Sequence, residues 1–485
     1  MSLSGALASA VSGLAANTRQ LQVTSGNIAN ALTPGYAARD VTLTTAAAGG
    51  GVRVVSTDRA ADPAITALRR EADADAAAAG TLAEGQARLA TAFGELGDNT
   101  GLIPAAARMT EALRDLADTP SSGPRQDAAA RAAADLATSF NTTAEAANTL
   151  RSDTDAEIAR LVTTVNTATS EIAALNAEIR RAQATTGDTT ALEDRRETLI
   201  DQVNGALPVT VFPEAGGTVS LRTREGALLV GNQARPLTFT PTPIVTPGQA
   251  YANGTGALSG ISLGGVDITP GGAGSQQPTS GALAGLFTLR DTEIPAFIAN
   301  LDGAAEDLIS RFEGVTDPTL APTDAALFSD AGARLTPPPD PGLAGRLTVN
   351  PAIDPSTGVP SRLRDGLGAT VEGPAGNDSF LRALTEALDT RTTAASTPAA
   401  AGNLDFATRL SALSEAASTK RVEAETLRST TDATRNTLAD AEGTTIGVDQ
   451  DRELENLIRI EQAYAANAQV IRTASAMLDE LTSIR

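Results

Sequence analysis

Large apolar residues recur every seven positions at both ends of this chain. At the N-terminus the repeat consists of Leu7, Leu14, Leu21 and Ile28, with Val11 at a partner position. At the C-terminus it consists of Leu457, Tyr464, Ile471 and Leu478, with Leu454 beside it. A seven-residue apolar repeat predicts a helix that presents one narrow stripe to another helix. A stripe this narrow buries little surface in a lone helix, so each terminal helix needs a partner.

The simplest partner for each terminal helix is the other one, followed by further copies of the chain. The C-terminal repeat predicts a helix from about Asp451 to Ser483, roughly 50 Å long at the α-helical rise. Acidic residues at 449, 451, 453 and 455 suit the positive end of its dipole. The alternative is an ordinary pair of core helices, but the apolar stripes are thin and the surfaces around them are rich in Ser, Thr and Asn.

Between the two ends, the residue pattern changes from helical to mixed. Runs rich in Ala, Leu, Glu and Arg at helical spacing predict helices, and short alternating runs between Gly and Pro predict strands. The expected parts are an N-terminal axial helix and turn at 1–45 that pairs with a C-terminal axial helix at 445–485, a helical domain at 46–207 continued at 281–314 and 400–444, a β-rich insert at 208–280, and a loop-rich mixed insert at 315–399. We therefore expect an α+β, elongated, multidomain fold. Its terminal helices form a coiled-coil-like core, with a helical inner domain and β-rich outer inserts.

Composition argues against most enzymatic and nucleic-acid-binding classes. The formal charge is −21, which disfavours phosphate backbones and anionic membranes. The chain has no His and no Cys, so HExxH zinc sites, thiol catalysis and disulfides are absent. Its one lysine, Lys420, is not in a phosphate-loop motif, and there is no GxSxG elbow. We predict no catalytic, cofactor or metal site, although Asp and Glu are common enough to leave a carboxylate pair open.

The N-terminal stripe ends in a distinctive turn motif, Ser25-Gly-Asn-Ile-Ala-Asn-Ala-Leu-Thr-Pro-Gly-Tyr36. Asn27 and Asn30 suit a helix end, because Asn tolerates left-handed backbone and bonds backbone groups. Pro34 and Gly35 suit a tight turn that leads to Tyr36. The motif resembles the signature of flagellar rod, hook and hook-associated proteins. The stretch from Glu453 to Ile471, which includes Asn467, resembles the C-terminal helix of the same family.

Two internal stretches resemble the hook-associated protein 1 branch of that family. They are the acidic and basic helix at 192–203 and the return from strand to helix at 280–291. One departure is the sequence after Arg311-Phe312, where the family pattern would give an Asn-rich turn with a His. The resemblance implies a structural, non-catalytic subunit of the hook–filament junction, built into a hollow tube through its terminal helices. The expected assembly interface comprises Leu7, Val11, Leu14, Leu21, Asn27, Ile28, Asn30, Pro34, Gly35, Tyr36, Leu454, Leu457, Tyr464, Asn467, Ile471 and Leu478.

The resemblance also implies partners and an export route. The partners are further copies of the chain, the hook protein, a second junction protein (hook-associated protein 3) and a cytoplasmic chaperone on the C-terminal helix. The location implied is the extracellular flagellum. No positive charge precedes Arg19, so we expect export without a cleaved signal peptide. The alternatives are a hook-like or flagellin-like subunit and a surface adhesin.

Overall fold

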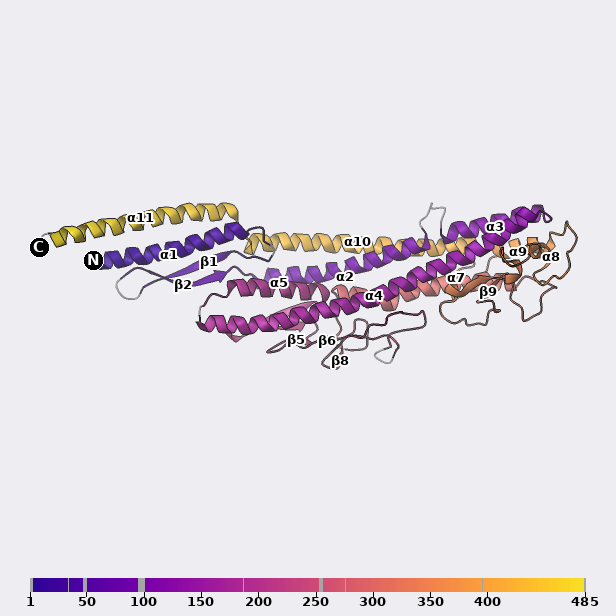
Figure 1. Cartoon of the computed structure of the whole chain (residues 1–485), viewed down its shortest axis with the longest axis horizontal. Coiled ribbons are helices and arrows are strands. Elements are labelled where there is room, and N and C mark those ends of the chain that lie inside the picture. Colours follow the sequence, from indigo (N-terminus) through magenta and orange to yellow (C-terminus); the bar gives the residue numbers. More distant parts are fainter. Residues whose placement is uncertain are drawn as a thin grey trace. The chain divides into compact units, whose positions relative to one another are not determined.

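The computed structural model describes residues 3–33, 35–46, 50–94, 101–185, 187–252, 256–274, 276–394 and 396–483. Helices make up most of these residues, and small sheets of two or three strands accompany them (Figure 1). The α+β class expected from the sequence is confirmed. Among the described residues, no helix combines the length and the apolar character that a bilayer crossing requires.

The chain forms two compact units, which are described separately here. Unit 1 comprises Met1–Ala76, Thr163–Leu237 and Thr430–Arg485. Unit 2 comprises Ala77–Val162 and Thr238–Ser429. Three long helices contribute residues to both units, namely α2 (Pro63–Phe93), α4 (Gly123–Thr185) and α10 (Phe406–Ile446).

Unit 1 brings the two ends of the chain together. α1 (Leu3–Asn30) and α11 (Gln450–Ser483) lie side by side and antiparallel (Figure 1). Gly13 faces Asn467, and further along the pair Asn27 bonds to Glu453. The predicted pairing of the terminal helices is confirmed, and the predicted C-terminal helix is correct to within one residue at its start.

Two side-chain contacts between α1 and α11 are made by residues outside the predicted α1 stripe of Leu7, Leu14, Leu21 and Ile28, namely Gly13 against Asn467 and Asn27 with Glu453. The buried residues of α1 are Ala10, Ala16, Asn17, Thr24 and Asn27. The predicted stripe of Leu7, Leu14, Leu21 and Ile28 is only half-buried. At Gly13 and Asn27 a small residue and a hydrogen-bonding residue meet α11, and the small residue lets the two helices approach closely.

A β-hairpin follows α1, and the sequence did not predict it. β1 (Arg39–Thr45) pairs antiparallel with β2 (Val52–Arg59), from Arg39 opposite Arg59 to Thr45 opposite Val52. Its turn end is tied to α1, because the Val52 backbone N–H donates to Ser12 Oγ at 3.1 Å. The strands are rich in Thr and charged residues with mostly exposed faces, so they show little of the apolar alternation that identifies a strand.

The rest of unit 1 is α5 (Thr190–Ala206) and a three-stranded antiparallel sheet. The sheet is ordered β3 (Val209–Pro213), β4 (Val219–Thr223) and β5 (Leu228–Val230), with a 3-10 turn at Ala215–Gly217. α4 ends at Thr185, and α5 begins at Thr190. Strands also begin where they were expected, directly after Pro208.

Unit 2 is a helical core with short strands and loops. Its helices are α3 (Leu102–Asp118), α6 (Ala282–Thr288), a π-helical turn at Leu289–Glu293, α7 (Ile294–Glu313), α8 (Arg362–Asp365) and α9 (Ser379–Asp389). Its strands are β6 (Leu237–Thr238, whose first residue belongs to unit 1), β7 (Ser262–Leu263), β8 (Val266–Asp267), β9 (Phe328–Asp330) and β10 (Leu347–Val349). Single 3-10 turns lie at Leu343–Arg346, Pro351–Ile353 and Pro398–Ala400. The core holds Met109 and Leu113 of α3, Phe140 of α4, and Leu308 and Phe312 of α7, all at most 1% exposed.

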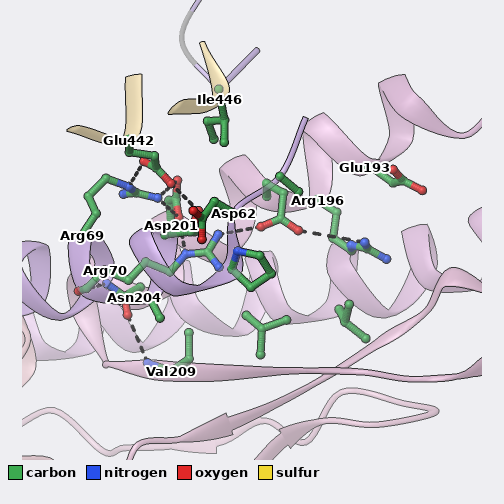
Figure 2. A pocket seen from close by; sticks show the side chains of 18 of the residues that line it. Asp62, Arg69, Arg70, Glu193, Arg196, Asp201, Asn204, Val209, Glu442 and Ile446 are labelled. Atoms are coloured by element: carbon green, nitrogen blue, oxygen red, sulfur yellow. Dashed lines mark hydrogen bonds and ion pairs between the residues drawn. The ribbon is translucent and has the colours of Figure 1, made fainter. Parts of the chain in front are cut away.

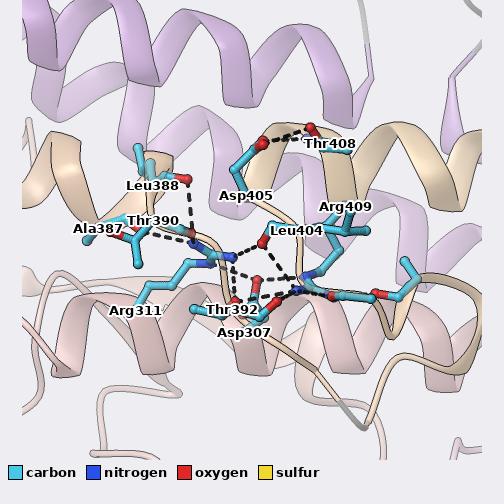
Figure 3. A network of polar contacts seen from close by, with 12 residues as sticks. Asp307, Arg311, Ala387, Leu388, Thr390, Thr392, Leu404, Asp405, Thr408 and Arg409 are labelled. Atoms are coloured by element: carbon cyan, nitrogen blue, oxygen red, sulfur yellow. Dashed lines mark hydrogen bonds and ion pairs between the residues drawn. The ribbon is translucent and has the colours of Figure 1, made fainter.

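A buried polar network fastens the loop between α9 and α10 to these helices (Figure 3). Asp307 Oδ2 accepts hydrogen bonds from Arg311 Nε at 2.8 Å and from Arg409 Nε at 3.0 Å. The two guanidinium groups also donate to backbone carbonyls, including Thr392 and Leu404. One carboxylate cannot neutralise two arginines, so the carbonyl dipoles supply the remaining stabilisation.

Candidate functional site at the terminal joint

The motif after α1 forms the first part of a site that we call the terminal joint. It is the region of unit 1 where the end of α1, the turn to β1, the middle of α5 and the start of α11 meet. Its residues are Asn27, Tyr36, Arg39, Arg59, Asp194 and Glu453. These residues come from six separate elements or turns, so the joint holds the terminal helices on the rest of unit 1.

The turn between α1 and β1 is compact and touches α5. Asn30 is the last residue of α1, and its side-chain amide donates to the Gly26 carbonyl at 2.9 Å. Gly35 has a φ of 81°, a left-handed conformation that favours glycine. A Cβ there would lie 2.6 Å from Thr198 Oγ1 of α5. Glycine is therefore required both by the backbone and by the approach to α5, while Pro34 lies outside the described residues.

Asn27 is the centre of the joint. Its Nδ2 donates to the Arg39 carbonyl at 2.9 Å and to Glu453 Oε1 at 2.8 Å. Its Oδ1 accepts from the Tyr36 hydroxyl at 2.8 Å and from the Arg39 backbone N–H at 3.1 Å. These four bonds use the full capacity of an amide side chain. Since Asn27 is 0% and Glu453 5% exposed, the bond between them also offsets the cost of burying the carboxylate.

Asp194 of α5 holds both strands of the hairpin. Its Oδ2 accepts from Arg39 Nη2 and its Oδ1 from Arg59 Nε, both at 2.6 Å. The side chains are 15–22% exposed, so water screens these ion pairs less than it screens surface pairs. The Arg39 guanidinium also lies 4.8 Å from the centre of the Tyr36 ring. This contact adds a cation–π interaction to the ion pair.

The environment of Tyr36 keeps its phenol protonated. Burial raises the pKa of Tyr36 above 10.0; the Arg39 charge opposes this rise, and the charges of Asp194 and Glu453 add to it. The phenol therefore remains the hydrogen-bond donor to Asn27 throughout the neutral range.

α5 carries an acidic stripe that extends the joint towards α2 and α10, and Figure 2 shows its last member, Asp201, beside Arg69 and Arg70. Asp194, Glu197 and Asp201 are spaced by three and four residues and therefore share one face of the helix. Arg70 Nη2 donates to Glu197 and Arg70 Nε to Asp201, both at 2.7 Å. Arg69 donates to both oxygens of Asp201 at 2.9 Å. The stripe therefore binds the hairpin at one end and α2 at the other.

Arg69 also reaches α10, where it pairs with Glu442. Burial opposes the charge of Arg69, but Asp201, Glu442 and Asp73 outweigh it, so the pKa of the guanidinium is raised above its ordinary value. The start of α2, α5 and the end of α10 are thus joined by one set of ion pairs.

A cleft of about 710 Å³ lies beside these ion pairs within unit 1. Arg69 and Arg70 on its wall are bound to carboxylates, and Arg196 donates to the Gly217 carbonyl at 2.7 Å. Over the part of the chain that the structure describes, no group of three or more acidic side chains is placed to hold a metal ion. The charged groups of this cleft connect helices, and we assign no catalytic or cofactor-binding residue to it.

The predicted interface residues fall into three groups. Two lie in the joint, namely Asn27 and Tyr36. Those half-buried along or at the end of the helix pair are Leu7, Leu14, Leu21, Ile28, Asn30, Leu457, Asn467 and Ile471. Those with exposed positions are Val11, Gly35, Leu454, Tyr464 and Leu478. None of the large apolar side chains of the two stripes is fully buried in the chain itself.

Sequence reasoning missed most of the charged residues of the joint. Arg39, Arg59 and Asp194 were not singled out, and Glu453 was treated only as an acid suited to a helix start. The signal for Asp194 was the spacing of acids along α5, which places Asp194, Glu197 and Asp201 on one face. No pattern in one sequence identifies which distant arginines meet that face.

Comparisons with known proteins match three segments of the chain to flagellar family models. The model of the flagellar hook-associated protein FlgK helical domain matches residues 87–318. The flagella basal body rod protein model matches residues 7–36, and the flagellar basal body rod FlgEFG protein C-terminal model matches residues 445–484. The last two matches contain α1 with its turn, and α11.

Full-length relatives point to the same family. Flagellar hook-associated protein 1 of Bacillus subtilis is 23% identical over 497 residues, which cover 96% of each chain. That of Escherichia coli is 26% identical over 555 residues, which cover 100% of each chain. The solved flagellar hook junction protein FlgK from Burkholderia pseudomallei aligns with a TM-score of 0.44 and 20% identity, over 54% of this chain and 46% of that one. The chain is thus similar along its whole length to flagellar hook-associated protein 1, and three flagellar family models match separate parts of it.

Proposed function

We propose that this chain is a structural subunit of the bacterial flagellum at the junction between hook and filament, where it assembles through its terminal helices. The relatives that it matches along their whole length carry the name of that role. The structural observation that supports it is the composition of the α1–α11 pair. Small and polar residues lie at its seam, and large apolar residues remain at its surface.

The exposed apolar side chains are numerous for two helices in water. Their exposed fractions are 52% for Val11, 50% for Leu454, 54% for Ile458, 43% for Tyr464, 45% for Val470, 51% for Met477 and 41% for Leu478. Full burial of one such side chain stabilises a contact by about 1.5–3 kcal/mol, so covering the remaining half of each contributes about 1 kcal/mol. Repeated contacts with neighbouring subunits cover this surface and give the assembly its stability.

The exposed apolar side chains of α1 and α11 are also the surface through which we propose that partners bind. Copies of the chain cover it within the tube, and the hook protein and hook-associated protein 3 meet the tube at its two ends. Before assembly, a cytoplasmic chaperone bound to α11 keeps the apolar residues from aggregating. Export to the extracellular flagellum then follows.

Deletion of the gene tests this function. We expect cells without swimming motility that carry hooks but no filaments by electron microscopy. Expression of the full chain should restore filaments, and expression of a chain that lacks 451–485 should not. Normal filaments on the deletion strain would contradict the proposal, and loss of surface attachment with normal swimming would favour an adhesin.

A further inference from the structure

The α1–α11 pair contains two polar contacts that are separated by the same interval on both helices. Gly13 faces Asn467, and Asn27 bonds to Glu453. Asn27 follows Gly13 by fourteen residues, and Asn467 follows Glu453 by fourteen. The interval equals two seven-residue repeats, so both contacts occupy the same position of the repeat in an antiparallel pair.

The contact between Gly13 and Asn467 depends on the small size of glycine. Gly13 lies inside α1, where glycine weakens a helix relative to alanine. A Cβ at Gly13 would lie 2.8 Å from Asn467 Nδ2 and 3.3 Å from its Cγ. The absence of a side chain at Gly13 therefore creates the space that the Asn467 amide occupies.

The second contact depends on hydrogen bonding. Asn27 and Glu453 are both buried and share a bond of 2.8 Å. If α11 slid by seven residues, Glu453 would lose this donor while still close to the seam. A buried carboxylate without a partner is strongly unfavourable, so the shifted alignment is disfavoured.

The apolar stripes alone do not distinguish these alignments. Leu7, Leu14, Leu21 and Ile28 repeat every seven residues, as do Leu457, Tyr464, Ile471 and Leu478. A slide of seven residues places each large residue where its neighbour was. Hydrophobic contact is therefore nearly the same in both alignments, and selection must come from features that occur at single positions.

We propose that Gly13 with Asn467 and Asn27 with Glu453 form a register lock, which selects one antiparallel alignment of α1 and α11 from those that differ by seven residues. The lock is a property of one chain. Only its consequence rests on the proposed function: the chosen alignment determines which apolar side chains neighbouring subunits contact.

Disulfide trapping in the purified full-length chain tests the lock, because the chain has no cysteine of its own. The two contacts place Gln20 opposite Ile460, midway between them, so Gln20→Cys with Ile460→Cys reports the native alignment. Asn17→Cys with Asn456→Cys reports the alignment shifted by seven residues that places Glu453 opposite Gln20. With an intact lock, we expect the first pair to oxidise about tenfold faster than the second.

Variants of the lock then decide the outcome. Gly13→Ala should slow the native disulfide about fivefold, and Asn467→Ala in the same chain should restore its rate to within about twofold, because the clash is removed. Asn27→Leu should raise the shifted disulfide, whereas Asn30→Leu, a control outside the seam, should not. An unchanged native rate in Gly13→Ala, no rescue by Asn467→Ala, or loss of both disulfides in Asn27→Leu would each overturn the proposal. No cells or filaments are involved, so these results are independent of the test of flagellar function.

Discussion

Asn27 and Glu453 are 426 residues apart in the sequence, and they share a buried hydrogen bond of 2.8 Å where α1 meets α11. A polar contact thus joins the two ends of the chain. The bond is specific because both partners are buried and Asn27 has no unused hydrogen-bonding group. The large apolar residues of the two stripes are half-buried or exposed.

Replacing Asn27 by alanine should destabilise this contact strongly. Asn27→Ala removes four hydrogen bonds and leaves the Glu453 carboxylate buried without its amide donor. We expect a loss of about 3 kcal/mol in the free energy of unfolding, because an unsatisfied buried charge is costly. Urea unfolding followed by circular dichroism measures the loss. Asn30→Ala, which removes local bonds only, should cost no more than about 1 kcal/mol, and equal losses would contradict this role of Asn27.

Asp194 should hold the hairpin on α5. Asp194→Asn removes the charge that binds Arg39 and Arg59, and we expect a cost of about 2 kcal/mol, between that of exposed and fully buried ion pairs. Hydrogen exchange of the 39–59 backbone should become faster. The control is Arg114→Ala, which breaks an ion pair with both side chains more than half exposed and should cost less than about 1 kcal/mol. Unchanged exchange in Asp194→Asn would show that the hairpin is held by other contacts.

Tyr36 should ionise at a higher pH than a free tyrosine. Its folded pKa is raised above 10.0, so the contribution of its proton to stability is complete below pH 10 and is lost as the pH rises through the folded pKa. Ultraviolet titration of a Tyr251→Phe/Tyr464→Phe chain follows Tyr36 alone, and the urea-unfolded chain gives the reference. A midpoint at or below that of the unfolded chain would contradict the environment described for Tyr36.

Arg409 should fix the loop between α9 and α10. Arg409→Met keeps most of the side-chain volume but removes its bonds to Asp307 and to the Thr392 carbonyl. We expect a loss of about 3 kcal/mol, since Arg409 is 0% exposed and belongs to a buried network. Limited proteolysis should detect faster cleavage near Thr392. Arg382→Ala, which breaks an exposed pair with Asp378, is the control and should leave the cleavage rate unchanged.

The sequence predicted the elements whose signal is local. The seven-residue repeats gave both terminal helices, and helical spacing gave α4 and α5 with the break between them. These elements are marked by their own residues, through periodicity or turn signals.

Features that depend on distant partners could not be predicted in the same way. The β1–β2 hairpin packs on α1, and its own residues alternate only weakly. The contacts of Gly13 and Asn27 with α11 are visible only once Asn467 and Glu453 are placed opposite them. The prediction relied on hydrophobicity and therefore selected the leucine stripe. Hydrophobicity does not identify small or hydrogen-bonding residues as helix contacts.

We infer that the half-buried stripe of α1 makes contacts between subunits. Filament formation by a variant of this stripe tests the inference most directly. A gene carrying Leu14→Asp and Leu21→Asp is expressed in the deletion strain, and filaments are counted by electron microscopy. The control carries Ile244→Asp and Val371→Asp, which add the same charge at exposed apolar positions of unit 2. We predict secretion of both proteins, filaments with the control and none with the stripe variant. Filaments of normal number and length on cells with the stripe variant would contradict the account.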